Sequence, residues 1–269
     1  MPIAIQEDML TGDRLIEKFE TARALGVDGI EFWGAGLTEN VPEIVAAMQA
    51  TGLRAAPVNQ GGSLGRLLDP LPAERERALA NLRQSIMNAC DIGAPGVIVV
   101  PHFGAPILPD LAPWMTAAEM EIELMYTHLR TLEDYAEAMG VDLYIEPINR
   151  YETHLLNRLE QAAALTRRMN HPRVKIVADL FHMALEEADL PAAIRAHADC
   201  IGHVHLADNN RRLPGEGSTD FAAAAAALGE IGYGGWASFE CGRPTRNNPA
   251  DYRSGLPASI AHVRDAGFV

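Results

Sequence analysis

The chain has 269 residues, of which 48% are hydrophobic and 22% are charged, a composition typical of a folded globular protein. Its net charge of −14, from 36 acidic and 22 basic residues, repels phosphate backbones and argues against nucleic acid as a partner. Three scattered cysteines without a CxxC pair argue against a disulfide framework or a zinc ribbon.

The first ten residues, MPIAIQEDML, carry acidic side chains where a secretory signal needs an apolar run. No stretch of the sequence reaches the length of a membrane span. We therefore expect a cytoplasmic protein without a membrane partner.

One unit recurs along the chain, namely a short apolar strand, a loop and an amphipathic helix. Strands are predicted at 3–5, 27–33, 53–58, 96–100, 141–145, 174–179, 200–206 and 236–240. Helices are predicted at 13–25, 41–50, 73–90, 117–139, 159–169, 191–197, 221–228 and 251–265. Such alternation predicts a parallel sheet with right-handed crossovers.

Eight units of about 30 residues are typical of a closed (β/α)₈ barrel. We predict a single α/β domain over residues 1–269 with the TIM-barrel fold. A doubly wound open sheet is the alternative, but it usually carries a glycine-rich phosphate turn after its first strand. No such turn follows residues 3–5.

The stretch VDLYIEPINRYE at 141–152 contains the first candidate site. Side chains of a strand alternate between its two faces, so Val141, Leu143 and Ile145 share one face while Glu146 points to the other. Parallel α/β folds bind their ligands at this carboxyl end of the strands. Glu146 is therefore a candidate functional carboxylate.

Three further strand ends repeat this pattern. Asp179 ends VKIVAD, His205 lies in GHVHLAD, and Glu240 ends WASFE. In a closed barrel, strands five to eight would direct three carboxylates and one imidazole toward a common point. Like charges in a dry pocket repel one another unless a cation shares the space. Oxygen-rich ligands with a single imidazole suit Mn²⁺, Mg²⁺ or Co²⁺ better than structural Zn²⁺.

Other interpretations exist for each residue alone. A single strand-end carboxylate is more often a helix cap or an ion-pair partner, and the coincidence of four such residues in phase favours a metal. We interpret His203 as a histidine packed behind the site. His102, after the fourth strand, either faces a substrate or supports its loop, and Trp33 and Trp114 either line the pocket or lie in the core.

The motifs EPINRYE, DLFHM, GHVHLADNNRR and FE at these four strand ends resemble the xylose isomerase-like superfamily of sugar isomerases and epimerases. The nearest branch is the ketose 3-epimerases of the D-tagatose and D-psicose type, with hydroxypyruvate isomerases as close relatives. The resemblance covers residues 140–242. The N-terminal half matches only in its alternation of strands and helices. It implies a sugar substrate, a divalent ion (Mn²⁺ first) and a homodimer or homotetramer.

The resemblance also implies roles for individual residues. The metal ligands would be Glu146, Asp179, His205 and Glu240. The two glutamates among them would also serve as the acid/base pair. The oxygens of the substrate would contact Glu152, His182 and Arg211, with His102 as a further candidate. Hydroxypyruvate isomerases typically carry glutamine in place of His205, so the histidine favours the epimerase branch.

This site predicts a metal-dependent ketose epimerase or isomerase. A cation on the carbonyl and the adjacent hydroxyl oxygen stabilises the enediolate that forms when a proton leaves the carbon beside the ketone. Return of a proton to the opposite face inverts that carbon, whereas return to the neighbouring carbon gives aldose–ketose isomerisation.

Several alternatives stay open. The arginines on the last two loops (211, 212, 243 and 246) are compatible with a phosphorylated sugar. A hydroxypyruvate-type isomerase, or a dehydratase or lyase of a 3-keto sugar, could use the same site. A metal-dependent nuclease would need more histidines and a basic groove, and a non-catalytic protein would not need the complete set of four ligands.

Overall fold

The computed structural model describes residues 1–61, 66–242 and 252–269. Eight parallel strands close into one barrel in the order of the sequence, and β1 pairs with β8. The strands are β1 (Ile3–Gln6), β2 (Gly29–Trp33), β3 (Arg54–Asn59), β4 (Gly96–Val99), β5 (Asp142–Ile145), β6 (Val174–Asp179), β7 (Ile201–Leu206) and β8 (Ala237–Phe239). The predicted (β/α)₈ barrel is confirmed.

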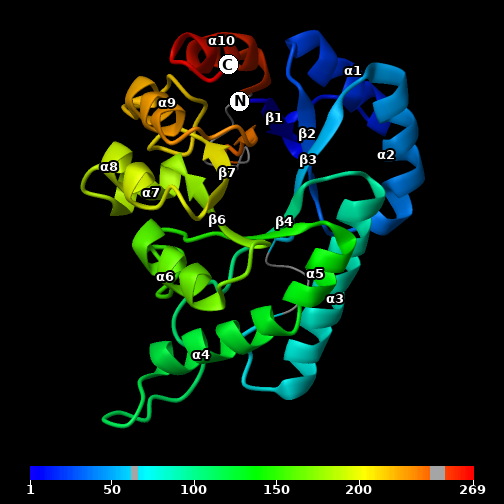
Figure 1. Ribbon diagram of the computed structural model, residues 1–269. Coiled ribbons are helices and arrows are strands. Elements are labelled where there is room, and N and C mark those ends of the chain that lie inside the picture. The colour runs from blue at the N-terminus through cyan, green and yellow to red at the C-terminus, as the bar shows by residue number, and fades with distance from the viewer. Residues whose placement is uncertain (62–65, 243–251) are drawn as a thin grey trace.

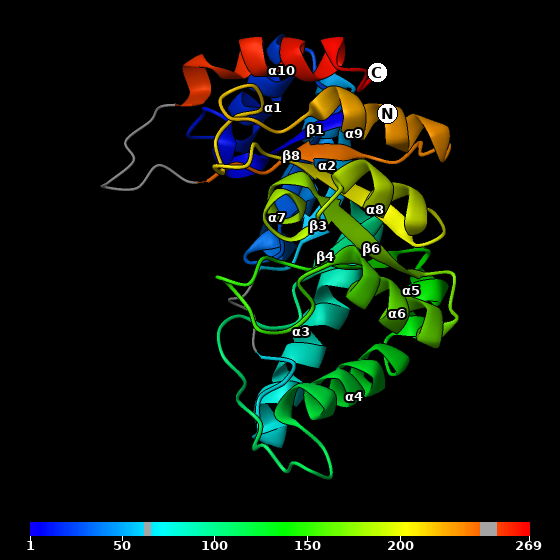
Figure 2. The same cartoon turned by 90° about the vertical axis from the view of Figure 1, so that its left-hand side faces the viewer.

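Helices surround the barrel (Figures 1 and 2). They are α1 (Leu15–Leu25), α2 (Leu37–Thr51), α3 (Pro72–Asp91), α4 (Ala117–Arg130), α5 (Glu133–Met139), α6 (Leu159–Met169), α7 (Leu180–Glu186), α8 (Leu190–Ala196), α9 (Phe221–Glu230) and α10 (Leu256–Asp265). Short 3₁₀ segments are η1 (Glu7–Met9) and η2 (Tyr252–Ser254). Within the described residues, no helix has both the length and the apolarity needed to cross a bilayer.

Alternate residues of a strand belong to two different parts of the core, as expected of a strand in a barrel. Leu143 and Ile145 of β5 pack in the large cluster between strands and helices, whereas Tyr144 belongs to a separate cluster inside the barrel. The Tyr144 ring leaves no room for a side chain at Gly96 of β4 or at Gly202 of β7, because a Cβ added there would come within 2.3 or 2.5 Å of the ring. A packed barrel interior of this kind directs the polar strand ends to the mouth.

Several helical segments differ from the prediction. The helix expected at 117–139 is divided into α4 and α5, because the Thr131 hydroxyl donates to the His128 carbonyl at 2.7 Å and ends the first helix. Helix α7 was not predicted, and it begins directly after Asp179, whose carboxylate caps its first turn. The closing helix, expected from residue 251, begins at Leu256.

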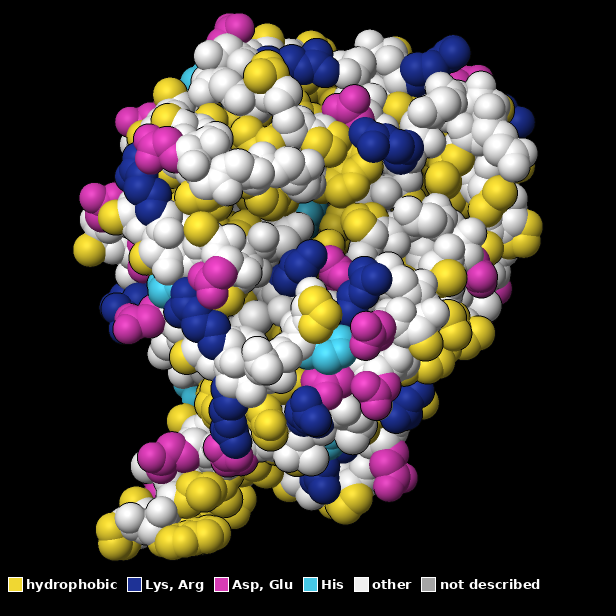
Figure 3. All heavy atoms as spheres, in the orientation of Figure 1, with side chains coloured by type: hydrophobic (Ala, Val, Ile, Leu, Met, Phe, Trp, Pro, Cys, Tyr) yellow, Lys and Arg dark blue, Asp and Glu magenta, His cyan; other side chains and the backbone are white. Residues whose placement is uncertain are grey.

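The loop between β4 and α4 projects from the barrel (Figure 1). Its tip is largely hydrophobic (Figure 3), and Trp114 is 73% exposed, so the interpretation of Trp114 as a core residue is wrong. Nearer the barrel, the Gly104 amide donates to the Glu152 carbonyl at 2.7 Å and the His154 amide donates to the Gly104 carbonyl at 3.1 Å. These bonds join the loop after β4 to the loop after β5.

The loop after β7 is organised by the buried carboxylate of Asp208. One of its oxygens accepts the amides of Asn209 and Thr219, and the other accepts those of Gly215 and Gly217, at distances from 2.8 to 3.0 Å. Burial opposes ionisation, but these backbone hydrogen bonds outweigh it and lower the pKa of Asp208. The loop so fixed carries Arg211 to the barrel mouth.

We expect Asp208→Asn to lower the free energy of unfolding by about 1–3 kcal/mol, because its amide would present a donor to backbone donors. The matched control is Asp220→Asn. Asp220 caps α9 by accepting the Ala223 amide, and asparagine is an equally good cap. Urea unfolding of both variants measures the difference, and equal stabilities would contradict the role given to Asp208.

The pKa shift sets the pH range of this effect. Because the folded-state pKa of Asp208 lies below the unfolded-state value, its stabilisation is present above the unfolded-state pKa and is lost as the pH falls through the folded-state pKa. The two variants should therefore differ at neutral pH and converge in acid.

Candidate metal centre

The four predicted ligands come together at the barrel mouth. One ligand atom from each of Glu146, Asp179, His205 and Glu240 lies within 4.8 Å of all the others. Asp179 and His205 lie on β6 and β7 and are paired in register, while the two glutamates directly follow β5 and β8. All four residues are buried. The four side chains converge because the carboxyl ends of parallel strands lie at the same end of the barrel and each of these residues points into its interior.

His205 presents its Nδ1 atom to the three carboxylates. This nitrogen lies 2.9 Å from Glu146 Oε1, 3.2 Å from Glu240 Oε2 and 3.7 Å from Asp179 Oδ2. Burial disfavours a charged ring, but the carboxylates around it outweigh burial and raise the pKa of His205 well above its usual value. The imidazole is therefore central to the cluster.

Asp179 divides its two oxygens between structure and site. Its Oδ1 atom caps α7 by accepting the amides of Phe181 at 2.7 Å and His182 at 3.2 Å. Its Oδ2 atom faces His205 and accepts a hydrogen bond from Arg211 Nη1 at 3.0 Å. Asp179 is therefore a helix cap through one oxygen, while its other oxygen faces the candidate metal centre.

Arg211 balances part of the negative charge. Its Nη2 atom donates to Glu240 Oε2 at 2.7 Å, and its guanidinium group lies 4.5 Å from the centre of the Phe181 ring. Burial works against ionisation of Glu240, but the charges of His205 and Arg211 outweigh it and lower its pKa. For Glu146, burial dominates and raises the pKa to about 7.

The donor set fits a divalent cation. Three carboxylates and one imidazole nitrogen converge from four separate elements in a buried site, and one arginine cannot neutralise three negative charges. Oxygen-rich sites of this composition bind hard or borderline ions. The buried cluster can therefore hold a metal ion, as the sequence predicted.

Two of the predicted substrate-binding residues, His182 and Arg211, lie against the cluster. His182 Nδ1 accepts the amide of Asn149 at 3.0 Å, so a neutral ring carries its proton on Nε2. That nitrogen lies 3.5 Å from Asp179 Oδ2 and 3.2 Å from Arg211 Nη1. Burial is the main cause of the lowered pKa of His182, which keeps the ring neutral.

Glu152 and His102 lie farther out. Glu152 is exposed, and its Oε1 atom accepts a hydrogen bond at 2.8 Å from Asn149, the residue that also contacts His182. The His102 Nε2 atom bonds to the Ala105 carbonyl at 2.8 Å. Neither residue is part of the four-ligand cluster.

His102 lines a cavity of about 450 Å³, a volume within the range of small-molecule sites. The four candidate ligands do not line it. Its walls include Gln60, which follows Asn59 at the end of β3, and Val99, whose carbonyl accepts the Glu146 amide at 3.0 Å. The walls also include Ala78 and Leu82 of α3, so the cavity lies between the barrel wall and that helix, under the loop after β4.

Sequence reasoning missed three polar residues of the first three strands, namely Gln6 and Asn59 at the ends of β1 and β3 and Glu31 within β2. Gln6 Nε2 donates to Glu240 Oε1 at 3.0 Å and to Glu31 Oε1 at 2.9 Å, and Asn59 Nδ2 donates to Glu240 Oε1 at 3.1 Å. All three are buried. The signal was present, because Glu31 interrupts the apolar strand VDGIEFW in the same phase as the ligands of the later strands.

Comparisons with known proteins show the family of this chain. Residues 19–262 match the family model described as xylose isomerase-like TIM barrel. The 3-dehydro-D-guloside 4-epimerase of Escherichia coli strain K12 is 32% identical over 262 residues, covering 95% of this chain and 98% of that protein. The resemblance thus extends over the N-terminal half, where the motifs alone gave no match.

Two further proteins are similar to this chain. The D-psicose 3-epimerase of Enterocloster bolteae is 42% identical over 113 residues, which are 42% of this chain and 38% of that protein. Among solved structures, a 3-keto-D-glucoside 4-epimerase from E. coli superposes with a TM-score of 0.87 at 29% identity, over 98% of this chain and 99% of that one. The chain belongs to the xylose isomerase-like TIM barrel family, and its epimerase relatives identify it as an enzyme of the isomerase class.

Proposed function

We propose that the protein is a divalent-metal-dependent epimerase that inverts the carbon next to the ketone of a keto sugar. The observation that carries the proposal is the convergence of the four candidate ligand atoms within 4.8 Å of one another. Two of these ligands are glutamates that come from different sides of the barrel, as inversion requires.

The ion would be held by Glu146, Asp179, the Nδ1 atom of His205, and Glu240, with Mn²⁺ as the first candidate and Mg²⁺ or Co²⁺ as alternatives. When bound, a divalent cation supplies positive charge that stabilises the negative charge left on the sugar's oxygens after a proton leaves carbon.

Glu146 and Glu240 would move the proton. They follow β5 and β8, which are separated by β6 and β7 in the closed barrel, so their carboxylates approach a bound sugar from different directions. One takes the proton from the carbon beside the ketone, and the other returns a proton to the opposite face. One C–H bond breaks and one forms, so the configuration inverts without oxidation or reduction.

The neighbouring polar groups would hold the sugar in place. His182 offers its Nε2 proton and Arg211 offers guanidinium protons to the carbonyl and hydroxyl oxygens, since both groups already lie against the ligands. Glu152, on the loop after β5, would bind a hydroxyl nearer the solvent. His102, on the loop after β4, is a further candidate for contact with the substrate.

A 3-keto glycoside is favoured over a free ketose as the substrate. The E. coli 3-dehydro-D-guloside 4-epimerase aligns over 95% of this chain, whereas the D-psicose 3-epimerase of E. bolteae aligns over 42%. The chemistry is shared, because each inverted carbon is adjacent to a ketone.

The preference can be tested by incubating the metal-loaded protein in D₂O with 3-keto glycosides and, separately, with free ketoses. NMR would follow which C–H signal disappears. We expect exchange at the carbon beside the ketone and faster exchange with the glycosides. Faster exchange with free D-psicose or D-tagatose would return the assignment to a ketose 3-epimerase.

The alternative of a phosphorylated substrate has less support. Arg211 is engaged with two carboxylates, and Arg212 pairs with Glu216 at 2.7 Å. Arg243 and Arg246, the other two arginines considered, lie outside the described residues. The homodimer or homotetramer and the cytoplasmic location stay predictions from the sequence.

We expect Glu240→Gln to weaken Mn²⁺ binding and, at saturating Mn²⁺, to slow solvent exchange of the substrate's carbon-bound hydrogen by at least about 100-fold, because the amide cannot transfer the proton. The readout is the rate of C–H signal loss in D₂O. Glu160→Gln, at a side chain 69% exposed, is the control and should exchange at the parent rate. Exchange by Glu240→Gln at that same rate would remove it from the acid/base pair.

Metal removal should lower stability. Restoring Mn²⁺ to the chelated protein at 100 times its Kd should stabilise it by about 2.7 kcal/mol, with one ion bound per chain. In Asp179→Asn this gain should largely disappear, while the fold should persist because asparagine also caps α7. Thermal unfolding and calorimetric titration measure both. An equal gain in Asp179→Asn and the parent would exclude Asp179 as a ligand.

A further inference from the structure

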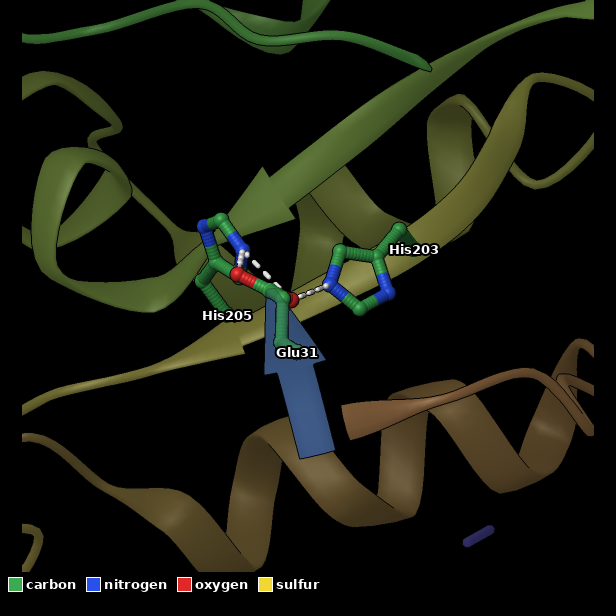
Figure 4. Close-up of side chains that lie close together, drawn as sticks. All are labelled: Glu31, His203 and His205. Carbon is green, nitrogen blue, oxygen red and sulfur yellow. Dashed lines mark hydrogen bonds and ion pairs between the residues drawn. The ribbon is translucent and has the colours of Figure 1, made fainter. Parts of the chain in front are cut away.

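A second cluster lies directly behind the candidate metal ligands. Glu31 of β2 lies between His203 and His205 of β7 (Figure 4). Its Oε2 atom is 2.9 Å from His203 Nε2, and its Oε1 and Oε2 atoms are 3.2 and 3.3 Å from His205 Nε2. All three side chains are completely buried.

The two nitrogens of His205 therefore face different partners. Nδ1 faces the three carboxylates of the candidate metal centre, and Nε2 faces both oxygens of Glu31. An imidazole that gives the Nδ1 lone pair to an ion keeps its proton on Nε2. A carboxylate opposite Nε2 accepts that proton in a hydrogen bond, whereas the other tautomer would place two lone-pair acceptors against each other.

Glu31 is itself held in one orientation. Gln6 Nε2 donates to its Oε1 atom at 2.9 Å. The His203 ring is fixed by the stacked ring of Tyr144, at 5.9 Å between centroids, and by the edge-on ring of His205, at 4.8 Å. Among the residues that the structure describes, none is a hydrogen-bond partner of His203 Nδ1, so the ring donates through Nε2 to Glu31.

This position requires an acceptor. Within the described part of the chain, the partners of the Glu31 carboxylate all present N–H groups, from Gln6, His203 or His205. A carboxylate accepts at both oxygens, whereas the amide of glutamine would direct one donor at other donors. Burying an ionised carboxylate is costly, and a carboxylate against the rear of a metal-ligating imidazole orients that ring and raises its basicity.

We propose that Glu31 is a positioning residue that holds His205 in the tautomer with its proton on Nε2 and thereby directs Nδ1 to the metal. The inference rests on the proposed metal centre. A competing possibility is that Glu31, His203 and His205 form a metal site of their own, because their ligand atoms also lie within 4.8 Å of one another. The number of ions per chain separates the two.

The test uses Glu31→Gln in the full-length protein. We expect its affinity for Mn²⁺ to fall about 10–100-fold, with one ion per chain in both the parent and the variant. In the Mg²⁺-loaded proteins, ¹⁵N NMR of the histidine side chains should show His205 protonated on Nε2 in the parent, and a mixed or reversed tautomer in the variant. Mg²⁺ is used because it is diamagnetic.

Glu121→Gln is the matched control, since Glu121 is equally buried and accepts the amide of Ile107 away from the cluster. It should bind Mn²⁺ as the parent does. Glu31→Asp keeps an acceptor-only group, so it should recover part of the lost affinity, and it serves as the test if Glu31→Gln does not fold. A loss of packing alone would leave the tautomer of His205 unchanged.

The outcomes that overturn the inference are distinct. Parental affinity and tautomer in both Glu31 variants would overturn it and leave the metal centre intact. Two ions in the parent and one in Glu31→Gln would make Glu31 a ligand, which also overturns it. If the parent bound no ion, the proposed function would fail together with the inference.

Discussion

The mutual repulsion of three carboxylates at the barrel mouth is the constraint on which the site depends. Ligand atoms of Glu146, Asp179 and Glu240 lie within 4.8 Å of one another in a buried position, where unit charges interact far more strongly than in water. Arg211 and the raised pKa of His205 compensate part of this charge. A divalent cation would compensate the remainder and give the cluster its chemistry.

The two halves of the barrel contribute differently to this constraint. Strands β5 to β8 supply the candidate ligands, while the ends of the first three strands supply hydrogen bonds that orient them. Gln6 and Asn59 both donate to Glu240 Oε1, and Glu31 lies behind His205. The closed barrel makes this possible, because β1 pairs with β8 and so brings the first strands beside the last. The N-terminal half is thus part of the site, although its sequence carries none of the motifs.

Much of the fold and the candidate ligands could be predicted from the sequence because both follow from local periodicity. Alternation within each strand assigns Glu146 and Asp179 to the barrel interior, and repetition of the unit predicts closure. The role of Glu31 could not be predicted, because its contact with His205 joins residues 174 positions apart and depends on which strands face each other across the interior. The break between α4 and α5 could not be predicted from the sequence, because no glycine or proline lies there. The hydroxyl of Thr131 ends α4 instead.

The most direct measurement is a crystal structure of the protein grown with Mn²⁺, with diffraction data collected at the manganese absorption edge. The anomalous difference map should contain one strong peak per chain, within bonding distance of Glu146, Asp179, Glu240 and the Nδ1 atom of His205. A peak bonded instead to Nε2 of His205 and to Glu31, or the absence of any peak at the barrel mouth, would contradict the central claim that these four side chains hold one catalytic ion.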